Sequence, residues 1–201
     1  MILCEFLRGG RVESVHRVSL AAVEGGRRGL ERGETTDPVW MRSCAKPFQC
    51  LTVVETGAAD AYGFSAPEIA LIAGSHAGDP EHVAAAASVL GKAGLGVGAL
   101  RCGVHAPRGS RGLRALHRSG KEPSALHNNC SGKHAGMVAA AKFLRTPLAT
   151  YLKPSHPLQR RNRATLARPR GSGGSRLTVA AAAGALDGFV DRSELGGREL
   201  R

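Results

Sequence analysis

The sequence predicts an α/β fold in which strands open the chain and helices make up most of the remainder. Two strand-like runs near the start are separated by a Gly-Gly pair, a signal for a β-hairpin. From about residue 43 onward, apolar residues recur at helical spacing between residues that begin and end helices. The 201 residues are enough for one domain with a sizeable core.

The predicted hairpin combines residues 2–7 (ILCEFL) with residues 11–24, and Gly9-Gly10 forms its turn. Residues 25–38 are rich in glycine and charge, so they are predicted to be a loop or a weak second turn.

The first helix is predicted to begin near Ser43, where Pro47 is tolerable only in the first turn, and to end at Gly57. Residues 66–73 predict a short helix, which leads into the loop 74–78 (GSHAG).

Asp79 is a good N-cap and Pro80 fits the first helical position, so a longer helix is predicted to begin there. Residues 101–110 resemble a loop, and three more helices are predicted over 111–119, 133–145 and 155–167. Alanine and glycine are abundant, which indicates either close helix packing or a composition bias without structural meaning.

The character of the chain changes near residue 162, which predicts a boundary between residues 1–162 and a tail over 163–201. Arg, Gly, Ser and Ala dominate the tail, and amphipathic periodicity fades. Residues 178–190 could form one apolar helix or strand.

The formal charge of +12 could indicate an anionic partner, but the excess gathers in an arginine-rich stretch over 159–176 that has no acidic residue. Few aromatic residues are available to stack on bases, and no nucleic-acid-binding module is recognisable, which argues against nucleic acid as a partner. Five cysteines without disulfide-like spacing, no evident signal peptide and no apolar stretch of transmembrane length favour a cytoplasmic protein with reduced thiols and no membrane partner.

Ser43 and Lys46 form an S-x-x-K pattern at the predicted start of a helix. Residues three apart share a helix face, so the hydroxyl and the amine can meet. A serine is a poor nucleophile until a base takes its proton, and a neutral lysine amine can be that base. The alternative is a capping serine beside a solvated lysine. Serine β-lactamases share the pattern, but their S-D-N and K-T-G motifs do not occur here.

A second cluster, Cys130, Lys133 and His134, has the spacing of one helix face. A thiolate beside a cation could bind metal or act as a nucleophile, whereas the alternative is a small buried cysteine next to a solvated lysine. In the loop 74–78, Ser75 and His76 stand between glycines that permit close backbone approach to a ligand; otherwise this is an ordinary loop between helices.

Taken in order, four motifs resemble the Rhizobium-type L-asparaginases, also called the asparaginase II family. They are RSCAKPFQ over 42–49, SHAGDPEH over 75–82, CGVHAP over 102–107 and HNNCSGKHAGM over 127–137. The opening RGGRVESVH over 8–16 matches the usual start of the family, and the resemblance covers roughly residues 5–162.

The resemblance implies a serine β-lactamase/glutaminase-like fold, an α+β sandwich with helices against an antiparallel sheet. It implies hydrolysis of L-asparagine to L-aspartate and ammonia, with Ser43 as the nucleophile and Lys46 as its base. Ser75 matches a second active-site serine, which the family pairs with a lysine far downstream. Arg42 and His134 match residues that line the same site.

Cys130 and Lys133 match two residues that bind a zinc ion near the substrate in this family. The third zinc ligand in the family is a later cysteine in an Asp-Gly-Cys-Gly stretch, but no cysteine follows Cys130 here. The downstream lysine is also missing, because Lys153 is the last lysine of the chain.

The family is considerably longer, so an incomplete asparaginase II-like domain over 1–162 followed by a frameshifted or disordered tail is expected, with exposed strand edges and poor solubility. A non-catalytic remnant and a basic binding protein are the alternatives to an enzyme. The resemblance leaves a homodimer, and glutamine in place of asparagine, as open alternatives.

Overall fold

The computed structural model describes residues 2–25, 27–35, 41–168, 177–182 and 185–190. Contacts divide the chain into two compact units, the first built mainly from residues 1–39 and the second mainly from residues 40–170. Each unit is described by itself.

The first unit contains the predicted hairpin. Strand β1 (Ile2–Arg8) pairs antiparallel with β2 (Arg11–Arg17), and the turn holds Gly9 and Gly10 at φ angles of 56° and 76°. Side chains rarely adopt these backbone angles, which explains the glycine pair.

A second hairpin follows, in which β3 (Leu20–Glu24) pairs antiparallel with β4 (Arg27–Arg32). The prediction of one strand over 11–24 was therefore wrong. For residues 25–38, the loop alternative was also wrong where β4 forms. Gly25 has a φ angle of 55° and reverses the chain, which places Glu24 opposite Arg27. The turn alternative is the one that forms.

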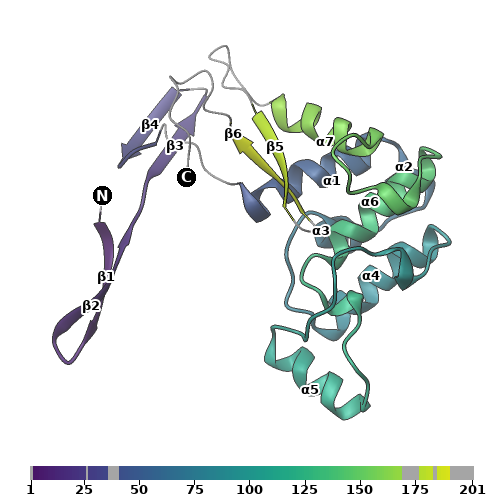
Figure 1. Cartoon of the computed structure of the whole chain (residues 1–201), viewed down its shortest axis with the longest axis horizontal. Coiled ribbons are helices and arrows are strands. Elements are labelled where there is room, and N and C mark those ends of the chain that lie inside the picture. Colours follow the sequence, from purple (N-terminus) through teal and green to yellow (C-terminus); the bar gives the residue numbers. More distant parts are fainter. Residues whose placement is uncertain (1, 26, 36–40, 169–176, 183–184, 191–201) are drawn as a thin grey trace. The chain divides into compact units, whose positions relative to one another are not determined.

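The second unit is largely helical (Figure 1). Its helices are η1 (Arg42–Ala45), α1 (Lys46–Glu55), α2 (Ala58–Ala61), α3 (Ala66–Ile72), α4 (Pro80–Lys92), η2 (Val97–Ala99), α5 (Ser110–Ser119), η3 (Ala125–His127), α6 (Ser131–Phe143), η4 (Leu148–Thr150) and α7 (Pro157–Ala167), where η denotes a 3₁₀-helix. The predicted helices are confirmed, and Asp79 stands at the N-cap of α4 as expected, where its backbone N–H donates to His82 Nδ1 at 3.2 Å.

Helix α6 lies at the centre of this unit and contacts α1, α2, α3, α4 and α7 (Figure 1). Every residue from Ser131 to Ala141 is buried. A Cβ atom at Gly132 would stand 2.5 Å from the backbone oxygen of Leu71, and one at Gly136 would stand 2.7 Å from Cγ2 of Ile72. Close helix packing therefore requires glycine at these two positions.

An ion pair joins α3 to α4 beneath the surface. Lys92 Nζ lies 2.7 Å from a carboxylate oxygen of Glu68, whose side chain is only 5% exposed. Burial raises the pKa of Glu68, but hydrogen bonds from Lys92, Ser88 and Ser65 outweigh that effect and lower it to about 2. The pair fixes the separation of the two helices that flank the loop 74–78.

Residues 177–190 form a third hairpin, in which β5 (Leu177–Ala182) pairs antiparallel with β6 (Ala185–Val190), instead of one helix or strand. Helix α7 continues through the predicted boundary at residue 162, and much of the predicted tail, 169–176 and 191–201, lies outside the described residues. The described strands form three separate two-stranded antiparallel sheets. The mixed helical and antiparallel content agrees with the predicted class, and the sandwich with its larger sheet stays a prediction.

Candidate active site

Two serines and a lysine come together where η1 meets the loop after α3. Ser43 Oγ lies 3.1 Å from Ser75 Oγ, and Lys46 Nζ donates a hydrogen bond of 2.5 Å to Ser75 Oγ. Lys46 is only 2% exposed, whereas both serines are exposed. A buried amine thus lies beneath two hydroxyl groups that solvent and small molecules can reach.

The local backbone explains how the S-x-x-K pattern works. Ser43 lies in the 3₁₀-helix η1 and Lys46 is the first residue of α1, with Pro47 in the first turn. Side chains three residues apart eclipse one another in a 3₁₀-helix, so the two point the same way. Arg42, just before Ser43, has a φ angle of 48°, which costs a non-glycine residue about 1 kcal/mol or more.

His76 anchors the loop that carries Ser75. Its backbone N–H donates to Asn129 O at 3.2 Å, and its Nε2 lies 2.9 Å from Ser131 Oγ. The Gly78 N–H donates to His76 Nδ1 at 3.2 Å, so Nδ1 accepts and Nε2 carries the ring proton. The loop is therefore fastened to the residues on either side of Cys130.

The same histidine is held neutral. Burial lowers the pKa of His76 to about 4, and the nearby His82, Lys46 and His105 act in the same direction. A neutral ring suits the two hydrogen bonds that His76 makes, because one nitrogen must accept and the other must donate.

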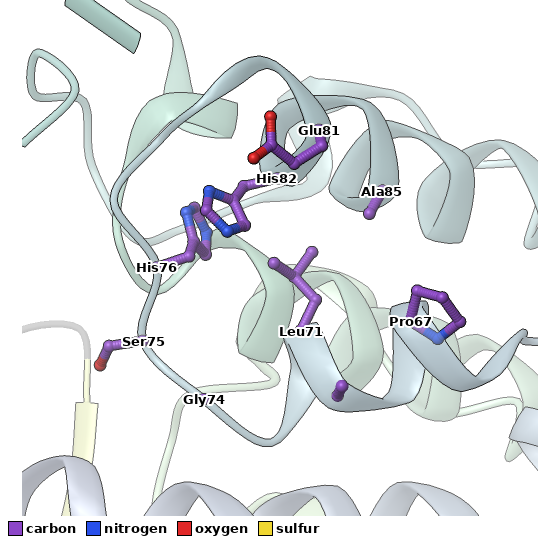
Figure 2. Close-up of a pocket in the computed structure, with 9 residues that line it drawn as sticks. Pro67, Leu71, Gly74, Ser75, His76, Glu81, His82 and Ala85 are labelled. Carbon is purple, nitrogen blue, oxygen red and sulfur yellow. The ribbon is translucent and has the colours of Figure 1, made fainter. Parts of the chain in front are cut away.

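A pocket of about 360 Å³ opens beside Ser75, within the range of small-molecule sites (Figure 2). Its walls are Pro67, Ala70, Leu71, Gly74, Ser75, His76, Glu81, His82 and Ala85. The rings of His76 and His82 stack with centroids 5.2 Å apart. The pocket combines an apolar side from α3 with polar groups from the start of α4.

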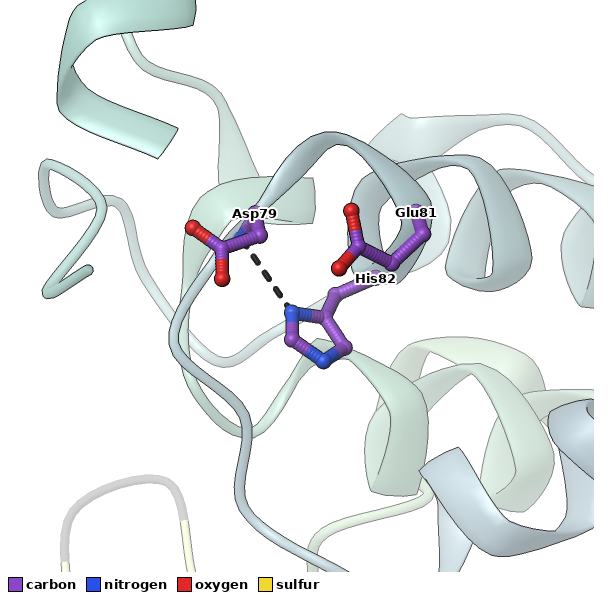
Figure 3. Close-up of side chains that lie close together, drawn as sticks. All are labelled: Asp79, Glu81 and His82. Atoms are coloured by element: carbon purple, nitrogen blue, oxygen red, sulfur yellow. Dashed lines mark hydrogen bonds between the residues drawn. The ribbon is translucent and has the colours of Figure 1, made fainter. Parts of the chain in front are cut away.

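Asp79, Glu81 and His82 bring ligand-type atoms within 4.8 Å of one another (Figure 3). These groups are already used within the protein. His82 Nδ1 accepts from the Asp79 N–H at 3.2 Å, Asp79 Oδ1 accepts from the Gly112 N–H at 2.8 Å, and Arg111 forms ion pairs with both carboxylates. The trio caps α4 and joins it to α5, and Arg111 supplies the positive charge.

Cys130 is the N-cap residue of α6 and is half-buried, and Lys133 follows in the first turn at 2% exposure. The side chain of Asn128 braces this corner, because its Oδ1 accepts from the Cys130 N–H at 2.8 Å. A thiol and an amine thus both stand at the first turn of the central helix.

Arg42 and His134, the other two residues predicted for the site, lie in different surroundings. Arg42 is exposed next to Ser43. His134 is fully buried, and its Nδ1 lies 2.7 Å from Tyr151 Oη, which also accepts from the Arg101 N–H at 3.0 Å. The pair joins α6 to the segment before α7.

A scan against protein-family models matches the chain to L-asparaginase II over residues 4–181. The chain belongs to the L-asparaginase II family. The match includes Ser43, Lys46, Ser75, Cys130 and Lys133 and continues beyond residue 162. A search of curated proteins gives no match.

Membership of the L-asparaginase II family agrees with the recognition of the four motifs and points to an asparaginase-like amidohydrolase with a small-molecule substrate. In the part of the chain that the structure describes, no helix is long and apolar enough to cross a membrane.

Sequence reasoning assigned no role to His76 as an anchor or to Asn128 as a brace. Both have a signal in retrospect. Asn128 precedes a helix start, where asparagine often bonds to nearby backbone, and His76 follows Ser75 directly in a glycine-flanked loop. The partners Ser131 of His76 and Cys102 of Asn128 lie far away in the chain, which spacing alone does not reveal.

Proposed function

We propose that the chain hydrolyses L-asparagine to L-aspartate and ammonia, with Ser43 as the nucleophile. The hydrogen-bonded run from Lys46 through Ser75 to Ser43 carries this proposal. A nucleophilic serine needs a base within hydrogen-bond reach, directly or through one relay group, and Ser75 is such a group.

In the first half-reaction Ser43 Oγ attacks the side-chain amide carbon of asparagine. Its proton passes to Ser75, and the proton of Ser75 passes to Lys46. The resulting oxyanion collapses, the carbon–nitrogen bond breaks, and Lys46 returns the proton through Ser75 to the departing nitrogen, which leaves as ammonia. The product of this step is an ester between aspartate and Ser43.

In the second half-reaction a water molecule attacks the ester carbonyl and gives its proton to the same relay. The bond to Ser43 Oγ breaks, aspartate leaves, and Ser43 recovers its proton. The sum is asparagine plus water to aspartate plus ammonia. The exposure of both hydroxyl groups favours this assignment, because substrate and water must reach them.

We extend the proposal to zinc bound by Cys130 and Lys133. A thiol and a buried amine are nitrogen and sulfur donors of the kind that zinc accepts. When bound, zinc would orient the substrate and polarise its carboxylate or amide. His76 links this corner to Ser75 through Asn129 and Ser131, so the two parts of the site belong together. A cytoplasmic location, which keeps thiols reduced, is part of this proposal.

The test is ammonia release by the full chain with asparagine and, separately, with glutamine as substrate. Ser43→Ala should lower kcat at least about 1000-fold, as expected for loss of a nucleophile. Ser75→Ala and Lys46→Met should each lower kcat by about 100- to 10,000-fold, the range for loss of base catalysis, and should alter the pH profile.

Ser155→Ala, which changes an exposed serine in the turn before α7, is the matched control and should retain full activity. If the parent chain releases no more ammonia than Ser43→Ala, the chain is a non-catalytic member of its family. Faster release from glutamine would change the substrate but keep the mechanism.

A further inference from the structure

A second thiol lies against η3, the short helix that precedes α6. Cys102 belongs to the segment between η2 and α5, is partly buried, and its Sγ lies 3.6 Å from Ala125 O. Cys102 precedes Cys130 in the sequence, in a different segment of the chain.

A single carboxamide holds the two cysteines beside each other. Asn128 Nδ2 donates to Cys102 O at 2.8 Å and to Gly103 O at 3.3 Å, while Asn128 Oδ1 accepts from the Cys130 N–H at 2.8 Å. The backbone of Cys102 and the backbone of Cys130 are therefore one side-chain amide apart, although 27 residues separate them along the sequence.

We propose that Cys102 is a third protein ligand of the zinc ion held by Cys130 and Lys133. This inference rests on the zinc part of the proposed function and is independent of the hydrolytic reaction. Two thiolates and one amine form a sulfur and nitrogen donor set that suits zinc, and three protein ligands leave a fourth position open for water or substrate. Each thiol releases its proton to solvent when it binds the metal.

The two free thiols near the start of α6 favour a bound cation over simple packing. Cys102 does not pair with Cys130 in a disulfide, because both thiols are free. The two thiols stand on backbone that Asn128 holds in place, which lowers the cost of ordering them around an ion.

The test is zinc affinity of the full chain, measured by competition with a chromogenic chelator, without any activity assay. The parent should bind one zinc ion. Cys102→Ser and Cys130→Ser should each weaken binding at least about 10- to 100-fold, since loss of even an outer partner of a metal site costs that much. Cys4→Ser, which changes an exposed cysteine on β1, is the matched control and should bind as the parent does.

Cobalt substitution provides a second readout. The thiolate-to-cobalt absorption of the parent should be that of two thiolates, and Cys102→Ser should reduce it to that of one. Zinc should also protect Cys102 from a thiol-modifying reagent in the parent, as mass spectrometry of the modified peptides would reveal.

The outcomes separate the two proposals. If Cys130→Ser loses zinc and Cys102→Ser binds within about twofold of the parent, with unchanged cobalt absorption, the role of Cys102 is overturned and the zinc pair stands. If Cys130→Ser also binds normally, zinc at this corner is refuted, while the reaction at Ser43 remains to be judged by ammonia release alone.

Discussion

Replacing Gly132 by alanine tests how the central helix positions the active site. Gly132 lies in the first turn of α6, where its Cα faces α3. An added Cβ would stand 2.5 Å from Leu71 O, 2.7 Å from Leu71 Cγ and 2.9 Å from Leu71 C. Two of these atoms belong to the backbone, so a change of side-chain rotamer cannot relieve the overlap and α3 must move.

The expected loss of stability arises from two opposing effects. Overpacking costs about 1–3 kcal/mol in the free energy of unfolding. The cost here is about 3 kcal/mol, because the close contacts are with backbone atoms. Alanine recovers up to about 1 kcal/mol over glycine within a helix. The net loss in the free energy of unfolding is about 2 kcal/mol, which raises the unfolding equilibrium constant about 30-fold.

The assay is urea denaturation of the parent, Gly132→Ala and Gly91→Ala. Gly91 lies in α4, and a Cβ there would meet no atom within 4 Å, so its replacement should leave stability unchanged or raise it by up to about 1 kcal/mol. The urea midpoint should fall for Gly132→Ala at an unchanged m-value.

Activity provides the second measurement on the same variants. Ser75 lies three residues beyond the end of α3, so a displaced α3 carries the relay hydroxyl away from Ser43. Ammonia release by Gly132→Ala should fall by more than the loss of folded protein explains. A Gly132→Ala variant as stable and active as the parent would refute the close approach of α3 to α6.

Three further predictions concern stability. Because hydrogen bonds lower the pKa of Glu68 to about 2, its carboxylate contributes fully to the free energy of unfolding above pH 4.5, and this contribution is lost as the pH falls toward 2. Glu68→Gln should therefore make the urea midpoint less dependent on pH between 4.5 and 2. An unchanged pH dependence would contradict the ion pair with Lys92. The pKa of His76 is lowered to about 4, so as the pH falls the unfolded state takes up a proton before the folded state does, and the free energy of unfolding should fall between pH 6.5 and pH 4. In His76→Asn the urea midpoint should no longer show this fall. Tyr151→Phe removes the hydroxyl that bonds to the buried His134 ring and to the Arg101 N–H, and should cost about 1–3 kcal/mol in urea denaturation, whereas a neutral result would show that water replaces the hydroxyl.

The sequence predicted local features best. Asp79 and Pro80 fixed the start of α4, and the helical spacing of apolar residues located α1, α3, α5 and α7 to within a few residues. These signals act over one turn of helix or less, so they are readable without the rest of the fold. The second hairpin was partly missed, because charged residues in β4 obscured the Gly25 turn.

Long-range contacts were beyond the reach of the sequence. The spacing of Ser43 and Lys46 predicted a direct hydroxyl–amine pair, whereas the hydrogen bonds of the structure pass through Ser75, which is 29 residues away from Lys46. Whether Ala and Gly reflected packing or bias was likewise undecidable until Gly132 and Gly136 were seen to face Leu71 and Ile72.

One segment explains both the position of the serines and that of the thiols. Asn129 and Ser131 hold His76, and His76 holds the loop in which Ser75 meets Ser43 and Lys46. Cys130 lies between Asn129 and Ser131. A ligand that tightens the start of α6 would therefore also steady the relay hydroxyl, because the hydrogen bonds that transmit the effect run through the two residues that flank Cys130. If the start of α6 and the relay are coupled in this way, added zinc should raise kcat by a larger factor than it lowers KM. A change in KM alone would show that the zinc site and the serine–lysine relay act separately.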